Sequence, residues 1–183
     1  MKMYKLLFTL LVVLFTNLSA TNQSNAILIN ESSVKFVSDA PLERIEAVSK
    51  SLMGAIDTAK KVFSFKIKMS SFKGFNSALQ KEHFEENYLE IMEFPYTTFT
   101  GKIIGTVDFS KDGDYEVRGK GSFTLHGIPN ERIIKCSINV NKGKVIITSD
   151  FNVNLKDHNI AIPRLVKQKI ADDIAVSLKI NMK

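Results

Sequence analysis

The sequence lacks the local motifs that identify most enzymes and most nucleic-acid-binding modules. It contains no G-x-S-x-G elbow, no P-loop, no G-x-G-x-x-G after a strand, and no zinc-knuckle or ribonucleoprotein spacing. Its three histidines, His83, His126 and His158, lie far apart and lack the paired spacing of a helical zinc site. Asp112 and Asp114 are explained by a turn between them. We therefore predict a protein without catalytic residues, metal, cofactor or nucleic-acid partner.

Cysteine is almost absent. Because Cys136 is the only one, no disulfide can form within the chain. Its neighbours Ile134 and Ile138 share its place in an alternating pattern, which predicts a buried structural thiol. A catalytic cysteine would need an activating partner, and the sequence shows none nearby.

Apolar runs long enough to cross a bilayer, which takes about 20 residues, are also missing. The apolar run from Leu6 to Phe15 is too short for that. Lys2 and Lys5 precede it, and a short polar tail ending in Ala20 follows. This order of basic, apolar and small residues is that of a secretory signal peptide.

We predict that residues 1–20 are a cleaved signal peptide, that residues 21–183 form one domain, and that the protein is periplasmic or secreted. The formal net charge is +6, of which the predicted signal carries the two charges of Lys2 and Lys5. No block of like charges stands out in the remainder. Such mild basicity is compatible with peripheral contact to an anionic membrane, although an ordinary solvated surface is the favoured interpretation.

What the chain does contain is alternation with a period of two, typical of half-buried strands. Lys142-Gly143 supplies the positive φ of a tight hairpin, and Lys111–Asp114 predicts a second hairpin turn. Several antiparallel strands with few breaks favour an all-β domain closed into a barrel of about eight strands. The alternating segments are residues 63–69, 99–109, 115–125, 134–140, 145–155 and 174–180.

One amphipathic helix interrupts this pattern, at residues 78–90. Ser77 can cap it, with Gln80 completing a capping box, and Pro95 follows the end of the segment. Leu79, His83 or Phe84, Tyr88 and Ile91 recur at helical spacing, while the opposite side is charged.

Two segments are ambiguous. Residues 42–56 fit either an amphipathic helix or two short strands, Glu43–Ser49 and Ser51–Asp57, and periodicity does not decide between them. Pro163–Asp173 could contain a short helix.

From Ser70 onward the chain resembles the YceI-like family, known as lipid- or polyisoprenoid-binding proteins. Three groups of residues carry the resemblance, and they occur in the family's order. The first comprises Ser71-Phe72, His83-Phe84, Tyr88-Leu89, Pro95 and Phe99-Thr100-Gly101. The other two are Gly121-Ser122-Phe123-Thr124-Leu125-His126-Gly127 and Phe151-Asn152-Val153-Asn154-Leu155-Lys156-Asp157-His158-Asn159-Ile160. One departure is clear: family members often begin with a Trp and a His-Ser pair, whereas the first strand here reads Ser33–Ser38 and the chain has no Trp.

The resemblance implies an antiparallel, lipocalin-like β-barrel with the helix packed at one end and an elongated apolar cavity inside. It also assigns residues 42–56 to strands and implies a hydrophobic ligand, namely a polyisoprenoid, quinone or related lipid. Under this hypothesis the helix residues Leu79, His83, Phe84 and Tyr88 form a lid, and His126 is a candidate contact for a polar head group. The expected cavity lining is Phe63, Phe65, Phe99, Gly101, Ile103, Phe109, Gly119, Gly121, Phe123, Leu125, Phe151 and Val153.

Each of these residues also has a purely structural interpretation. Large aromatics on inward faces suffice to fill a barrel core. The strand glycines Gly101, Gly105, Gly119 and Gly121 are more often positions where strands bend than positions that clear space for a ligand. The alternative hypothesis is therefore a barrel with a packed core that acts as a protein-interaction module in the cell envelope.

Overall fold

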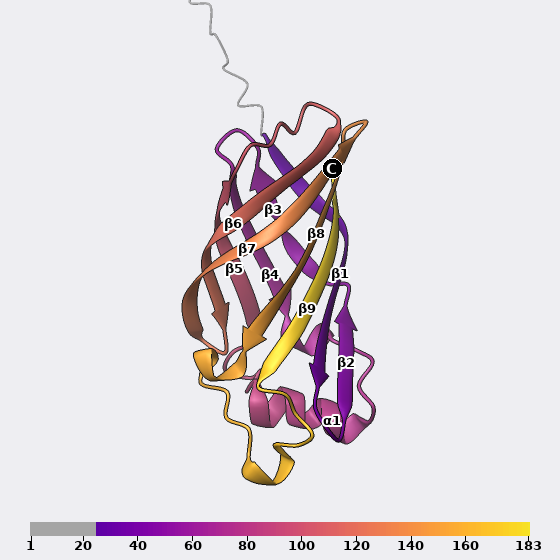
Figure 1. Ribbon diagram of the computed structural model, residues 1–183, viewed down its shortest axis with the longest axis vertical. Helices are drawn as coiled ribbons and strands as arrows, with labels where there is room; N and C mark the ends of the chain where they lie inside the picture. The colour runs from indigo at the N-terminus through magenta and orange to yellow at the C-terminus, as the bar shows by residue number, and fades with distance from the viewer. Residues whose placement is uncertain (1–24) are drawn as a thin grey trace, which may run out of the picture.

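A computed structural model describes residues 25–183; the predicted signal peptide lies outside the described residues. The described chain forms nine strands, each paired antiparallel with its neighbours (Figure 1). The strands are β1 (Ala26–Asp39), β2 (Arg44–Ser49), β3 (Leu52–Asp57), β4 (Val62–Lys68), β5 (Tyr96–Ile104), β6 (Gly113–Leu125), β7 (Ile128–Asn141), β8 (Lys144–Asn154) and β9 (Asp173–Met182).

The sheet closes into a barrel because β1 also pairs with β9. Leu28 exchanges backbone hydrogen bonds with Lys183 beyond β9, while Ala55 of β3 lies opposite Leu28 on the other edge. That other edge also carries β2, opposite Val34–Asp39. Because β2 and β3 follow one another along a single edge of β1, nine strands fill eight positions around the barrel. The predicted barrel of about eight strands is confirmed, and so is the assignment of residues 42–56 to strands.

The connections explain where the strands end. Lys142 and Gly143 have φ values of 48° and 75°, so the tight hairpin predicted there forms. The hairpin between β5 and β6 uses a longer connection than Lys111–Asp114 alone. Gly105, at φ 118°, turns the chain out of β5. The alternation predicted for residues 99–109 therefore stops early, and Phe109 lies in the connection.

The predicted helix is present but shorter and changes type. An α-helix, α1 (Ala78–Glu82), continues into a π-helical segment, η2 (His83–Tyr88), at the lower end of the barrel in Figure 1. The Ser77 hydroxyl accepts a hydrogen bond from the Gln80 N–H at 3.1 Å, as predicted. The Gln80 side-chain oxygen accepts from the Asn76 N–H at 2.9 Å, so the predicted capping box is shifted by one residue. Within residues 25–183, no helix is long and apolar enough to cross a membrane.

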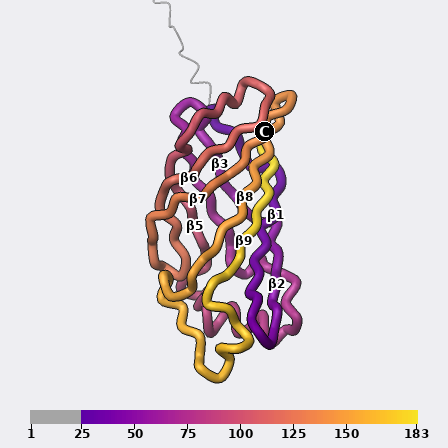
Figure 2. The backbone as a smooth tube through the Cα atoms, in the orientation of Figure 1, coloured from indigo at the N-terminus to yellow at the C-terminus, as the bar shows by residue number. Residues whose placement is uncertain are grey.

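Three short 3-10 turns complete the lower end: η1 (Met69–Ser71), η3 (Leu155–His158) and η4 (Arg164–Val166). The last lies in the segment Pro163–Asp173, where a short helix was one interpretation. Figures 1 and 2 show the segment between β8 and β9 extending below the strands. This end of the molecule is therefore built from turns and a short helix, whereas tight turns and one longer connection join the strands at the upper end.

Candidate functional site: an apolar cavity inside the barrel

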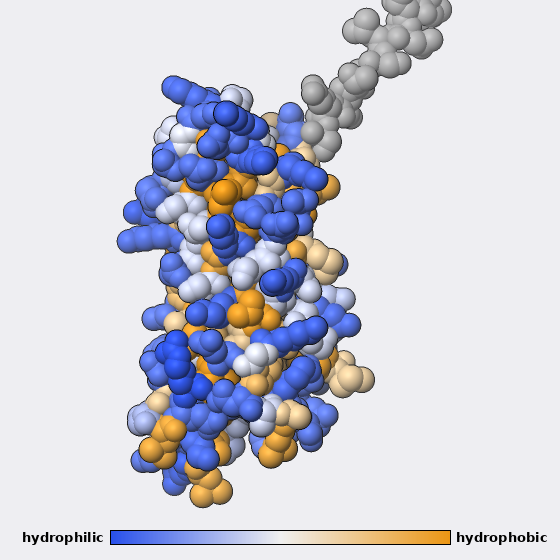
Figure 3. Space-filling model, turned by 90° about the vertical axis from the view of Figure 1, so that its right-hand side faces the viewer, coloured by the Kyte–Doolittle hydropathy of each residue, from blue (hydrophilic) through white to orange (hydrophobic). Residues whose placement is uncertain are grey.

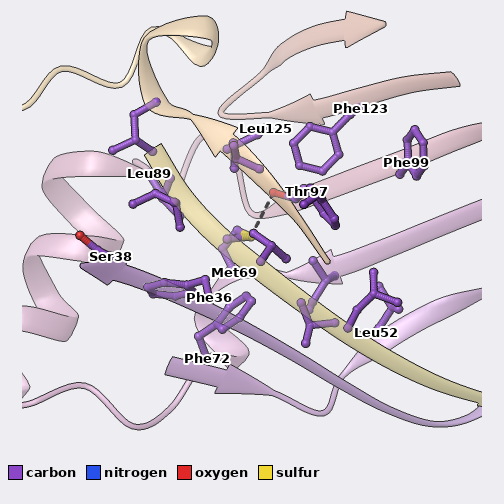
Figure 4. Close-up of a pocket in the computed structure, with 18 of the residues that line it drawn as sticks. Phe36, Ser38, Leu52, Met69, Phe72, Leu89, Thr97, Phe99, Phe123 and Leu125 are labelled. Atoms are coloured by element: carbon purple, nitrogen blue, oxygen red, sulfur yellow. Dashed lines mark hydrogen bonds between the residues drawn. The ribbon is translucent and has the colours of Figure 1, made fainter. Parts of the chain in front are cut away.

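The barrel interior is not solid. It encloses a cavity of about 540 Å³, which falls within the size range of small-molecule sites. Its wall is formed mostly by apolar side chains from the strands, the helix and the segment before β9. In the close-up of Figure 4, side chains such as Leu52, Phe72, Phe99 and Phe123 surround the space from several strands and turns. The alternative hypothesis assumed a barrel with a packed core, and the cavity does not agree with that assumption.

The upper end of the cavity is closed by a hydrophobic plug, defined here as Val107, Val140, Val145 and Met182. All four are buried, and none belongs to the cavity wall. Val145 lies directly opposite Val140 on one side and Met182 on the other, so strand register brings them together. Phe109, predicted to line the cavity, instead packs against this upper core. The turn at Gly105 places it there.

The lower end of the cavity is only partly covered, by the helix and the segment before β9. The wall residues that are exposed are Ser77, Leu79 and Lys169, and all three belong to the helix or to the segment before β9. Leu42 and Leu165, from neighbouring turns, are also exposed large hydrophobics, and the Leu42 N–H donates to the carbonyl of Gln168 at 2.9 Å. Figure 3 shows hydrophobic side chains at this end of one face, next to hydrophilic ones. Access to the cavity is thus at the helical end.

A cluster of four phenylalanines lies between the helical segment and the barrel interior: Phe36, Phe72, Phe75 and, from the helical segment itself, Phe84. The ring of Phe84 stacks on that of Phe36 with centroids 5.3 Å apart and contacts Phe75 at 5.0 Å and Phe72 at 6.2 Å. Phe84 was predicted as a lid residue, but sequence reasoning did not place the other three in the wall. Alternation with Val34 in the first strand was the available signal for Phe36. For Phe72 and Phe75, which lie outside regular strands, no periodic signal existed.

A second row of aromatic rings follows the wall deeper into the barrel. Phe63 contacts Phe65 and Phe99 at centroid distances of 5.5 and 4.8 Å, and Phe123 contacts Phe99 and Phe151 at 6.2 and 6.3 Å. All five belong to the predicted set, and all five lie in the wall. The other predicted residues that the structure places there are Ile103, Gly119, Leu125, Val153, Leu79, His83, Phe84 and Tyr88.

Gly101 and Gly121 are not among the wall residues, contrary to the expectation. They face each other across β5 and β6, and a Cβ on Gly121 would lie 2.0 Å from the carbonyl oxygen of Thr100. A Cβ on Gly101 would similarly meet the backbone at Lys120. These glycines therefore allow the two strands to approach closely, which is the structural interpretation. Gly119 differs, because a Cβ there would meet the rings of Phe63 and Phe99 at 3.3 Å.

The buried hydroxyl groups in the wall, those of Ser38, Thr97 and Ser149, are satisfied by the protein itself. The Ser38 hydroxyl accepts from the Ala171 N–H at 2.8 Å, and the Ser149 hydroxyl donates to the Lys135 carbonyl at 2.6 Å. The Thr97 hydroxyl donates to the Met69 sulfur at 3.1 Å, the contact drawn in Figure 4. A ligand inside the barrel therefore meets mostly apolar surface, and the buried hydroxyls of the wall already have partners.

The ionisable groups deep in the wall are uncharged, and the charged ones lie near the opening. Cys136 is half-buried in the wall rather than fully buried as predicted, and this burial raises the pKa of its thiol, so the thiol stays neutral. Burial likewise raises the pKa of the Tyr88 phenol. The charged wall residues are Glu43 and Lys169 near the lower end, and Glu43 accepts a hydrogen bond from the Gln80 amide at 2.9 Å. Charge is thus confined to the opening.

The three histidines have separate roles. His83 lies in the wall. His126, expected as a head-group contact, is not a wall residue; its ring nitrogens face the Glu90 carboxylate at 2.7 Å and the His158 carbonyl at 3.1 Å. It therefore ties the helix exit to the β6–β7 turn. His158 is fully buried, and within residues 25–183 no group of three or more His, Cys, Asp or Glu residues could hold a metal ion.

Fold and cavity together define a class: closed antiparallel barrels of the lipocalin type, with an apolar interior covered by a helix at one end. Within this class the chain belongs to the YceI-like domain family, whose model matches residues 26–182. The comparison with curated proteins gives no match.

Solved structures share the fold at low sequence identity. A polyisoprenoid binding domain from Saccharophagus degradans, implicated in plant cell wall breakdown, is 14% identical with a TM-score of 0.72, covering 86% of this chain and 97% of its own. BcnA from Burkholderia cenocepacia is 16% identical with a TM-score of 0.67, covering 82% and 95%. The Campylobacter jejuni YceI protein is 19% identical with a TM-score of 0.56, covering 72% and 78%.

Proposed function

We propose that this protein binds and sequesters a hydrophobic small molecule, a polyisoprenoid, quinone or related lipid, inside the barrel without catalysing a reaction. The observation that carries the proposal is the apolar cavity of about 540 Å³ whose buried hydroxyl groups already have protein partners. Membership of the YceI-like family and the fold shared with a polyisoprenoid binding domain support it.

The physical basis is transfer of apolar area out of water, worth roughly 25 cal/mol per Å². Few polar contacts fix the ligand, so selectivity rests on length and width of the apolar chain. The ligand enters at the lower end, where Leu79 offers exposed apolar surface. Lys169 and Glu43 are the charged residues there that a polar group of the ligand would meet. No covalent step is involved.

The proposal includes location in the cell envelope, after removal of residues 1–20. Its support is the order of basic, apolar and small residues at the start of the sequence. N-terminal sequencing of the protein recovered from its native host tests this part, and a mature chain that still starts at Met1 would overturn it.

Organic extraction of protein purified from its native host, followed by mass spectrometry, tests the ligand. We expect an isoprenoid-type lipid in near-stoichiometric amount. Recovery of no lipid, together with no binding of a fluorescent prenyl probe to the protein, would contradict the proposal.

A matched pair of variants on β9 sharpens the test. Val176 lines the cavity, whereas its neighbour Ala175 is exposed on the outer face. Val176→Trp fills part of the cavity and should reduce prenyl-probe affinity at least tenfold, while Ala175→Trp should leave it unchanged. Circular dichroism confirms that both variants fold. Equal affinity of the two variants would place the ligand outside the barrel.

A further inference from the structure

The outer surface of the barrel carries a block of positive charge without ion pairs that the cavity does not explain. It consists of Lys102 and Ile104 on β5, Arg118 and Lys120 on β6, and Ile133 and Lys135 on β7, and is called the basic block below. All six side chains are exposed. Within each strand the two residues are two positions apart, so they lie on the same face. The block contains four cations, two isoleucines and no acid.

The strand register makes this block unusual. Lys102 lies directly opposite Lys120, and Arg118 lies directly opposite Lys135. Cβ atoms of such pairs are about 4.5–5.5 Å apart, and like charges there destabilise a sheet. Across the pairings of the described strands these are the two places where like charges oppose each other, and they are adjacent. By contrast, β1 and β2 oppose Asp39 with Arg44.

The four cations of the basic block have no direct side-chain partner in the described part of the chain. None of the four forms an ion pair or a side-chain hydrogen bond among residues 25–183. The acids nearest in register lie outside the block. Glu116 accepts a hydrogen bond from Ser137 at 2.6 Å, and Glu131 lies opposite Ser122. An anion from outside the chain, placed over these cations, would relieve the repulsion between the opposed pairs.

We propose that the basic block is a docking surface for an anionic phospholipid membrane. The four cations match lipid phosphates, each attracted to an anionic surface when it lies near it. Ile104 and Ile133 are 44% and 60% exposed. The apolar side chains favour a bilayer over a hydrated polyanion, because a bilayer interface can remove them from water. On β4, Lys66 and Lys68 are also exposed, opposite Thr98 and Tyr96 of β5.

The block is on the side of the barrel formed by β5, β6 and β7, whereas the exposed wall residues of the cavity are at its lower end (Figure 1). Docking and ligand binding therefore use different surfaces. Failure of one proposal leaves the other testable.

Cosedimentation of the mature protein, residues 21–183, with vesicles tests the docking surface. We expect binding to phosphatidylglycerol–phosphatidylethanolamine vesicles that weakens as salt rises, and no binding to phosphatidylcholine vesicles. The double variant Arg118→Gln/Lys120→Gln should lower the partition coefficient about 25-fold, on the order of fivefold per charge. Its thermal midpoint should be unchanged or higher, since removing like charges relieves repulsion.

The control Lys144→Gln/Lys179→Gln removes the same charge from exposed positions on β8 and β9. It should change the partition coefficient by no more than about twofold, because remote exposed charges are screened.

Ile133→Ser should weaken vesicle binding without altering its salt dependence. Equal losses in the two double variants would reduce the effect to overall basicity and overturn the proposal. Equally tight binding to soluble polyphosphate, unaffected by Ile133→Ser, would overturn it in favour of a soluble acidic partner.

Discussion

The two ends of the cavity are closed by different kinds of structure. The upper end is a plug built mainly from strand residues such as Val140 and Met182, each 2% exposed and held by the register of β7, β8 and β9. The lower end is covered by α1 and η2, in which no residue is fully buried. Strand pairing is cooperative, whereas a short helix and its turns can open locally at lower free energy. The difference indicates that the ligand enters and leaves at the helical, lower end of the cavity, while the strands keep the upper end closed.

The largest expected effect is at the upper end. Met182→Ala removes a buried side chain from the plug and leaves a cavity, so the free energy of unfolding should fall by about 2–5 kcal/mol. Urea denaturation followed by circular dichroism measures it. Leu79→Ala, at a 58% exposed helix position, is the control and should cost far less. Equal losses would mean that both ends are equally integrated into the core.

At the lower end, Phe84→Ala removes the ring that contacts Phe36, Phe72 and Phe75. Because Phe84 is only partly buried, we expect a smaller loss of unfolding free energy, about 1–3 kcal/mol. The dissociation rate of a prenyl probe, followed by stopped flow, should rise by a larger factor than in Met182→Ala. A faster release from Met182→Ala would instead place the exit at the upper end.

The buried His158 makes the lower end sensitive to pH. Burial lowers the pKa of its imidazole below the ordinary 6.5, although its Nδ1–H donates to the Ile128 carbonyl at 3.2 Å. The unfolded chain then binds a proton that the folded chain does not, so stability is full above about pH 6.5 and falls as the pH drops toward the folded pKa. The slope is at most about 1.4 kcal/mol per pH unit. Urea midpoints at several pH values, compared with His158→Gln, measure this; an identical slope in the variant would exclude His158 as its source.

The smallest effect concerns the start of the helix. Ser77→Ala removes the hydroxyl that accepts the Gln80 N–H and should cost about 1 kcal/mol. Hydrogen exchange should rise in residues 78–88 and stay unchanged in β7 and β8. Increased exchange across the whole barrel would show that the helix and the barrel unfold as one unit.

Much of the fold was predictable because its signals are local. Alternation located the main strands, and the pair Lys142-Gly143 located a hairpin, since positive φ at both positions is a property of the turn itself. The Ser77 cap marked the helix start. The end of β5 was missed because Gly105 also fitted the alternation, and its φ of 118° is set by the path of the connection.

Most of the wall was predictable from the same alternation, but its details were not. Gly119 and Gly121 occupy equivalent positions in the pattern, yet one faces the rings of Phe63 and Phe99 and the other touches the backbone at Thr100. The distance between neighbouring strands decides this, and no property of the strand's own sequence encodes that distance.

By itself, the sequence determined the β-rich class, the strand faces, the helix and the family, because periodicity, capping and turn residues act over a few neighbours. Tertiary structure alone decided that the interior is a cavity of about 540 Å³ and that Phe36, Phe72 and Phe75 meet under the helix. It also decided that cations dispersed along the chain become opposed pairs on the outer face. The reason is physical: each of these features depends on register and closure, which bring together residues far apart in the sequence.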